Sequence, residues 1–138
     1  MVKPFIAEIL GPPVPLARPR FSRNGTWDPQ KEIKARFHWE IFRDMGRLDP
    51  LRGPLALDVH FHMTLARSCS KKRRRELIGF PHAQKPDLSN LVKFIEDVME
   101  GTLFLNDSQI VSIKAQKTYS ENPKTVIKIW EVNPPLEE

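Results

Sequence analysis

Cysteine is nearly absent from this 138-residue chain, and its shortage excludes two kinds of stabilising site. Cys69 is the single cysteine, so neither an intramolecular disulfide nor a metal site built from several thiolates can form. A chain without disulfides suits a reducing compartment. We therefore expect a cytoplasmic protein.

Long hydrophobic runs and glycine-rich loops are missing too. The apolar stretch at the N-terminus stops at Gly11-Pro12-Pro13, which leaves it too short for a signal peptide or a membrane span. No glycine-rich phosphate loop, Ser-His-Asp arrangement or zinc-finger spacing is present. We expect no membrane partner and no small-molecule cofactor.

The composition suffices for one packed domain over residues 1–138, because hydrophobic residues make up 40% of the chain. We expect residues 133–138 to form a frayed tail. The net charge of +5 is unevenly spread: seven basic residues and one acid lie between Arg67 and Lys85, so this segment carries +6 and the remainder −1. One strongly basic segment fits a nucleic-acid or other anionic partner.

Hydrophobic spacing predicts the main helices and strands. Apolar residues at intervals of four predict a helix from Pro29 to Met45, with Asp28 as its N-cap and Gly46 as its stop. An unbroken apolar stripe predicts a second helix that opens at Asp87 and ends at Gly101.

The remaining segments complete an α+β pattern. Alternating or short apolar runs predict strands at 5–10, 55–65, 109–119 and 124–132, with an extended stretch at 18–21, a short helix within 68–79 and a loop at 80–86. This order predicts a single α+β domain with one mixed β-sheet and two main helices on one face.

Two short carboxylates stand at the ends of predicted elements, where side chains can converge. Asp87 precedes the second helix, and Asp107 lies in the loop that enters the next strand. Carboxylates of this kind hold Mg²⁺, which activates water and neutralises charge during phosphodiester hydrolysis. The structural alternative is a helix cap at Asp87 and an ordinary turn residue at Asp107.

A family resemblance favours the metal site over the structural alternative. The stretch Lys85-Pro86-Asp87-Leu88-Ser89-Asn90-Leu91-Val92-Lys93, followed by Asp97 and Asn106-Asp107-Ser108-Gln109-Ile110, resembles the RusA family of Holliday junction resolvases. In that family an Asp-x-Asp-Asn-Leu-x-Lys helix start precedes a helical Asp and an Asp-Asp-x-Gln-Val strand entry. The segments Pro13-Val14-Pro15 and Arg18-Pro19-Arg20-Phe21 are similar to the family's N-terminal signature.

The resemblance implies a RusA-like fold and a role for each matching residue. Asp87 and Asp107 would be catalytic carboxylates that bind Mg²⁺, with Mn²⁺ as a possible substitute. Lys93 would be catalytic near the scissile phosphate, where a cation stabilises transition-state charge. Asn90 and Asp97 would support the site. The two-fold symmetry of a four-way junction implies a homodimer.

Two departures from the family pattern bear on activity. Ser89 replaces the second carboxylate of the helix start, and Asn106 replaces the first of two adjacent aspartates. Serine is a poor Mg²⁺ ligand, although its hydroxyl can support a coordinated water. Either Asp87 and Asp107 hold the metal with a helper such as Asp97 or Glu96, or activity is reduced or lost.

The basic side chains are the candidate DNA contacts. The run Lys71, Lys72, Arg73, Arg74 and Arg75, together with Lys85, lies just upstream of the acidic residues, so we expect phosphate contact rather than only a solvated surface. Arg18 and Arg20 flank Pro19 and could clamp a phosphate or form a plain surface pair.

Histidines and tryptophans supply weaker candidates. His60 and His62 share a strand face with Asp58, a spacing that can bind a transition metal but more often forms a polar face or a subunit contact. Trp27, Trp39 and Trp130 could stack on bases, but burial in the core or in an interface is the more usual role of tryptophan.

The sequence thus predicts a Mg²⁺-dependent endodeoxyribonuclease that resolves four-way junctions in DNA recombination and repair. One alternative is a non-cleaving junction-binding or DNA-binding protein in which Ser89 marks a degraded site. Another is an RNA-binding module that uses the basic segment.

Overall fold

A four-stranded mixed sheet forms the centre of the molecule. The computed structural model describes residues 3–18, 20–46 and 49–132, so the expected frayed tail at 133–138 lies outside the described residues. The strands are ordered β1-β6-β4-β5, where β4 and β5 are parallel and the other pairs antiparallel. Their bounds are β1 Phe5–Leu10, β4 Leu55–Thr64, β5 Ile110–Ser120 and β6 Lys124–Glu131. The predicted mixed sheet is confirmed.

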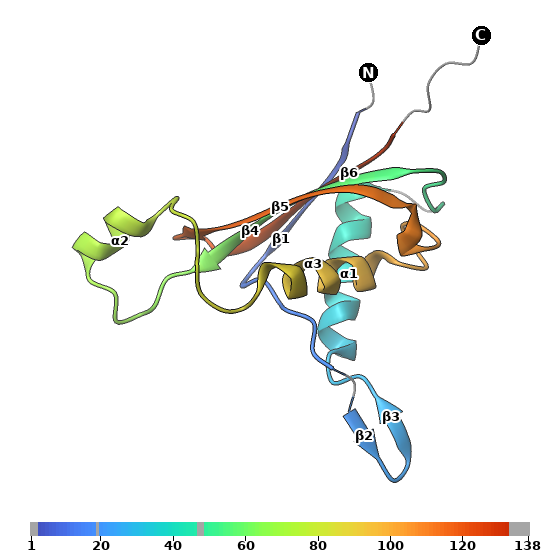
Figure 1. Ribbon diagram of the computed structural model, residues 1–138, viewed down its shortest axis with the longest axis horizontal. Coiled ribbons are helices and arrows are strands. Elements are labelled where there is room, and N and C mark those ends of the chain that lie inside the picture. The colour runs from blue at the N-terminus through green and yellow to red at the C-terminus, as the bar shows by residue number, and fades with distance from the viewer. Residues whose placement is uncertain (1–2, 19, 47–48, 133–138) are drawn as a thin grey trace.

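Two helices, α1 (Lys31–Met45) and α3 (Leu88–Met99), cover one face of this sheet, as Figure 1 shows. Phe37 of α1 meets Phe94 of α3 edge-on at 5.1 Å between ring centroids, and both rings are buried. Apolar side chains of all four main strands join the same core. The predicted α+β class, with two main helices on one face, is therefore confirmed.

Strand β4 sorts its side chains between the two faces of the sheet. Leu57, Val59 and Phe61 are buried in the core, whereas His60 and His62 point to the opposite face and are only half-buried. That second face, which α1 and α3 leave uncovered, is called the open face below. The predicted alternation along this strand is confirmed.

The start of α1 differs from the prediction. The helix begins at Lys31, and its N-cap position is Gln30 rather than Asp28. Asp28 instead accepts a hydrogen bond from the Gln30 N–H (2.8 Å) and forms an ion pair with Lys34. Its carboxylate stabilises the turn before the helix, so the first helical residue lies two positions later than expected. Gly46, with φ of 64°, ends the helix as predicted.

A small hairpin was not predicted. Strands β2 (Arg20–Ser22) and β3 (Gly25–Trp27) pair antiparallel around a two-residue turn, with Gly25 at φ 116°. Figure 1 shows this hairpin standing away from the body beyond the N-terminal end of α1. The extended segment predicted at 18–21 is confirmed at 20–21 as part of β2, while Pro19 lies outside the described residues.

A second projection carries the basic run. The short helix α2 (Lys71–Leu77) begins at Ser70, whose side chain accepts a hydrogen bond from the Arg73 N–H (3.1 Å). Figure 1 shows α2 beyond the end of β4, away from the core. The predicted short helix within 68–79 is confirmed. None of the described helices has the length and apolar character needed to span a bilayer.

Candidate functional site

Helix α3 organises the candidate site because it separates the two carboxylates that the sequence singled out. Its apolar stripe anchors it against the sheet and α1, with Leu91, Phe94 and Ile95 at 1% exposure or less. Asp87 stands at the N-cap position and Glu100 at the C-cap position. Because the apolar side is buried, only the polar side of the helix and its two ends can present side chains to a metal ion or a substrate.

The N-terminal end of α3 presents Asp87 beside a shallow hollow. Asp87 is exposed and makes no side-chain capping bond, which leaves its carboxylate available. Lys85, Asn90 and Leu16 line the same hollow. The Leu16 N–H donates to the carbonyl of Asn90 (3.0 Å), which ties the segment before β2 to this end of the helix.

The loop before Asp87 is fixed from the sheet. The ammonium of Lys117 on β5 donates to the carbonyl of Pro86 at 2.6 Å and also to that of Gln84. One lysine therefore hydrogen-bonds to two of the backbone carbonyls that precede Asp87. This contact positions Asp87 without occupying its carboxylate.

The C-terminal end of α3 carries a second acidic group, made of Glu96, Glu100 and Asp107. The backbone N–H of Asp107 donates to the Glu100 carboxylate (2.8 Å). Burial, followed by repulsion from Asp107 and Glu100, raises the pKa of Glu96, while the charge of Lys93 opposes the rise. These four groups thus lie within electrostatic reach of one another.

Asn106 has a structural role that explains one departure from the family pattern. It caps the short 3₁₀ helix η1 (Asp107–Gln109), accepting a hydrogen bond from the Ser108 N–H (2.8 Å). Gln109 closes the turn by accepting from the Asn106 N–H (3.1 Å) and donates to the carbonyls of Leu51 and Gly53. Asparagine caps as well as aspartate, so the presentation of Asp107 survives the replacement.

The structure does not bring Asp87 and Asp107 together within one chain. From Asp87 to Glu100 the helix rises about 20 Å at roughly 1.5 Å per residue. Asp107 is hydrogen-bonded at the Glu100 end. Two ligands of one Mg²⁺ lie only about 2.1 Å from the ion. In a single chain, therefore, these carboxylates cannot share a metal in this conformation.

A metal site does not form elsewhere in one chain either. Among residues 3–18, 20–46 and 49–132, no three or more His, Cys, Asp or Glu side chains are arranged so that they could hold a metal ion. The carboxylates at the ends of α3 supply the right donor type for Mg²⁺, hard oxygen, but each end alone is incomplete.

Of the two helper residues expected at the site, the structure places only Glu96 beside Asp107. Asp97 instead pairs with Lys34 of α1 at 2.7 Å, and Lys34 also pairs with Asp28. Asp97 therefore joins α3 to α1 and to the base of the hairpin. Ser89 lies exposed in the first turn of α3, near Asp87 in the chain.

Of the basic candidates, Lys85 lines the hollow beside Asp87. Lys71, Lys72 and Arg75 on α2 are exposed and form no ion pair with any described residue, whereas Arg73 pairs with Glu76 and Arg74 with Glu121. Arg74 also donates to the carbonyls of Ala66 and Cys69 and so stabilises its own loop. Exposed Arg18 lies near the hairpin base, and the backbone of Arg20 lies in β2.

The remaining aromatic candidates occupy other places. His60 and His62 stack on the open face at 4.0 Å between ring centroids, and His60 hydrogen-bonds Thr118. Trp27 (49% exposed) and Trp39 (63%) are not buried in the core, because the hairpin and the outer side of α1 do not enter it, so of the expected core or interface burial only the interface is left for these two. Trp130 is half-buried at the end of β6.

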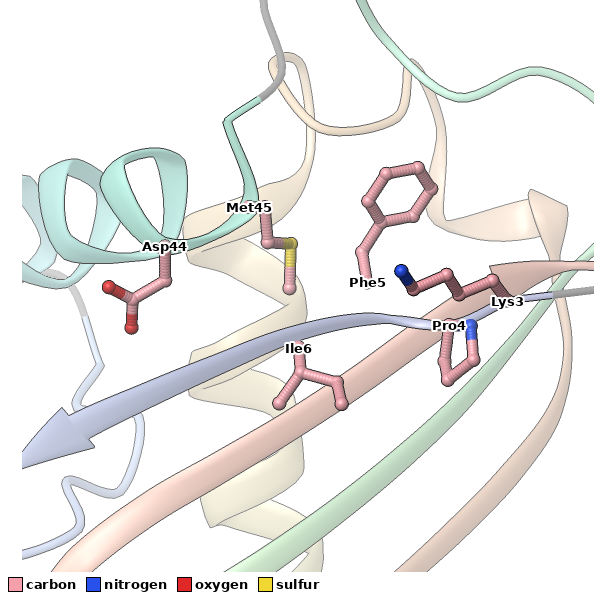
Figure 2. Close-up of a pocket in the computed structure, with 6 residues that line it drawn as sticks. All are labelled: Lys3, Pro4, Phe5, Ile6, Asp44 and Met45. Carbon is pink, nitrogen blue, oxygen red and sulfur yellow. The ribbon is translucent and has the colours of Figure 1, made fainter.

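A separate hollow lies between β1 and the C-terminal end of α1. Figure 2 shows Asp44 and Met45 of the helix beside residues 3–6. The Asp44 carboxylate already accepts a hydrogen bond from the Glu8 N–H (2.9 Å) and pairs with Arg43. This hollow contains none of the family motif residues and is not the candidate site.

Sequence reasoning missed Glu100 and Lys34. Glu100 follows Lys93 by seven residues and Glu96 by four, a spacing that places all three on one helix face, so it could have been found. Lys34 lies far from the motif in sequence. Only the packing of α1 against α3 brings it to Asp97.

The regions that match known proteins include both ends of α3. The sequence pattern of the family described as "Endodeoxyribonuclease RusA" matches residues 11–130. A Bacillus subtilis (strain 168) protein named "Uncharacterized protein YqaN" is 32% identical over 134 residues, covering 91% of this chain and 94% of that protein. The matched region includes the segment before the hairpin, the basic helix and both carboxylates.

Proposed function

Because the chain belongs to the RusA family of endodeoxyribonucleases, we propose that it resolves four-way DNA junctions by paired, Mg²⁺-dependent phosphodiester hydrolysis as a homodimer. Recombination and repair are the processes that produce such junctions. The observation that carries the proposal is the position of the two family carboxylates, Asp87 and Asp107, at opposite ends of one rigid helix.

Opposite ends of one helix become neighbours when two copies associate through a two-fold axis. In such a dimer the Asp87 end of one α3 can face the Asp107 end of the other. Each of the two sites would then combine Asp87 from one subunit with Asp107, supported by Glu96 and Glu100, from its partner. Two equivalent sites are what paired cuts in a two-fold symmetric junction require.

The chain's own residues would divide the work at each site. Asp87 and Asp107 would hold Mg²⁺, which supplies an activated water and charge neutralisation at the phosphate. Lys93, which lies among the acids of α3, would place a cation at the developing negative charge. Asn90 would hold the N-terminal end of the site in place through its backbone bond to Leu16.

The first test is cleavage of an end-labelled four-way junction by the wild type and by Asp87→Asn and Asp107→Asn. We expect paired nicks from the wild type only when Mg²⁺ or Mn²⁺ is added, and at least about a 100-fold loss in each variant. Cleavage by the wild type in excess chelator, or wild-type rates in both variants, would overturn the proposal.

Mixed dimers test whether each site is shared between subunits. Co-expressed Asp87→Asn and Asp107→Asn chains, purified through two different tags, would contain one intact shared site per heterodimer. We expect single nicks from this heterodimer and none from either homodimer. If each chain carried its own complete site, the heterodimer would be as inactive as the homodimers.

The second candidate is a protein that binds junctions without cutting them, favoured by the exposed serine at position 89. It predicts a shifted junction in a gel and no nicks at any Mg²⁺ or Mn²⁺ concentration. Ser89→Asp is the matched variant, since it restores the family carboxylate. Cleavage that appears only in Ser89→Asp would establish the non-cleaving candidate for the wild type.

A further inference from the structure

We propose that the β2–β3 hairpin is an arm that reads the branch point of DNA by stacking Phe21 on an exposed base. This inference rests on the proposed function and extends it, because it assigns a recognition element that the carboxylates do not provide. The arm is defined as residues 18–27.

The exposure of Phe21 is the first observation. Phe21 is 84% exposed, more than any other large apolar side chain in the described part of the chain. By contrast, Phe37, Phe61, Phe94 and Phe104 are at most 1% exposed. An aromatic ring left in water forgoes the free energy that burial of its apolar surface would release. Contact with a partner would recover that free energy.

The charge of the arm identifies the partner. Arg18, Arg20 and Arg23 lie within it, and residues 18–27 contain no acid. Cations that alternate with an exposed aromatic are the features with which proteins hold unpaired nucleic acid, through phosphate contacts and base stacking. The same positive charge opposes contact between two copies of the arm.

The position of the arm connects it to the candidate site. The Gln30 side chain accepts from the Ala17 N–H (2.8 Å) and donates to the Pro15 carbonyl (2.9 Å), which joins the two chain segments at the base of the arm. The adjoining Leu16 is bonded to Asn90, in the same hollow that Asp87 lines.

Ion pairs fix the other side of the base. Asp28 follows the arm directly and pairs with Lys34, which also pairs with Asp97 of α3. The arm therefore extends from a support that is tied to α3 at two places, near Asp87 through Asn90 and nearer the C-terminal end through Asp97. DNA held by the arm would have its nearby phosphates beside α3.

A branch point is where stacking surfaces become available. Base stacking is continuous along an intact duplex, and opening it to insert a side chain costs free energy at each base. At the crossing of four strands the stack is interrupted, so a ring can engage a base face at lower cost. The arm would thus favour a junction over a duplex of the same length and charge.

The test is fluorescence of 2-aminopurine placed at the branch point of a junction, with Ca²⁺ in place of Mg²⁺ to limit cleavage. We compare the wild type with Phe21→Ala and Phe21→Trp, and use Phe80→Ala as the control because Phe80 is also exposed (61%) but lies outside the arm. Sedimentation and thermal unfolding of each variant complete the set.

We expect the wild type, Phe21→Trp and Phe80→Ala to change the fluorescence. Phe21→Ala should lose that change and bind the junction about 10-fold more weakly, with duplex affinity and thermal unfolding unchanged. A full fluorescence change in Phe21→Ala would overturn the proposal, and so would dissociation of its dimer, which would make the arm a subunit contact.

The two proposals fail in different ways. If the wild type binds and changes the fluorescence but never cuts, the arm stands and the nuclease proposal falls. If the wild type cuts normally while Phe21→Ala behaves identically in every assay, the arm proposal falls alone.

Discussion

Glu96 and Asp97 are adjacent acids on α3 with opposite effects on stability. Burial and repulsion from Asp107 and Glu100 raise the pKa of Glu96, so its ionised form opposes folding. Asp97 pairs with Lys34 at 2.7 Å. Burial lowers the pKa of Lys34, but its bonds to Asp28 and Asp97 outweigh that effect and raise it.

Neutralising each acid should therefore shift stability in opposite directions. At pH 7, Glu96→Gln is expected to stabilise the protein by about 0.2–0.5 kcal/mol, because it removes a like-charge pair four residues apart. Asp97→Asn should destabilise it by up to about 1 kcal/mol. Urea unfolding of both variants is the measurement.

The pH dependence of the Glu96 effect is its control. Since the pKa of Glu96 is higher in the folded state, its penalty is absent below the unfolded pKa and grows as pH rises towards the folded value. The gain from Glu96→Gln should therefore disappear near pH 4. A gain that persists there would show that packing, not charge, is responsible.

At the scale of elements, the open face of the sheet carries two histidines that make the fold sensitive to acid. Burial, chiefly, lowers the pKa of both His60 and His62, and Lys124 adds to the effect in each. Asp58 opposes the shift at His60, and Glu8 opposes it at His62. Lys114 and Lys128 line the same hollow on this face.

Stability should consequently fall as pH drops below about 6.5, where the unfolded chain takes up protons that the folded histidines resist. A double variant, His60→Gln with His62→Gln, should flatten the fall in melting temperature between pH 6.5 and pH 5. Some slope should remain, because burial also lowers the pKa of His82. An unchanged slope in the double variant would contradict the assignment.

How far the sequence predicted each element depended on how local its determinants are. The stripe from Leu88 to Met99 and the alternation in β4 depend on one buried face each, and both predictions were confirmed. The predicted start of α1 was wrong because the Gln30 side chain is hydrogen-bonded to the backbone of Ala17 and Pro15, thirteen and fifteen residues away. No local pattern encodes those contacts.

The hairpin and the site geometry were missed for different reasons. Asn24-Gly25 is a strong turn signal, but its two strands are only three residues each, too short to show an alternation. The convergence of Asp87 and Asp107 was expected although the predicted helix between them already implied a separation of about 20 Å. The identity of the two aspartates suggested metal binding, but the length of the helix determined that they lie far apart in one chain.

For the whole molecule, charge is separated along α3. Lys85 lies beside Asp87, Figure 1 shows the basic helix α2 on the same side of α3, and the acidic group of Glu96, Glu100 and Asp107 lies at the other end. We expect DNA to bind first through the basic end. The exposed cations of α2 should contribute phosphate contacts there.

Salt dependence measures those contacts. Replacing Lys71, Lys72 and Arg75 with alanine should reduce the slope of log affinity against log salt by about 2 to 3, since each phosphate contact contributes about 0.9. Lys114→Ala with Lys128→Ala, on the open face, is the control and should leave the slope unchanged. A larger decrease of the slope in the control than in the α2 variant would show that DNA binds at the open face instead.

The length of helix α3 also fixes the separation and relative orientation of its two ends. Its twelve residues span about 18 Å, and each added residue would turn one end by about 100° relative to the other. Many substitutions on its exposed side would leave that distance and angle intact, whereas inserting or deleting even one residue would misalign Asp87 and Asp107 in every copy. In the proposed shared-site dimer, the length of this helix would therefore be under tighter constraint than the identity of most of its residues.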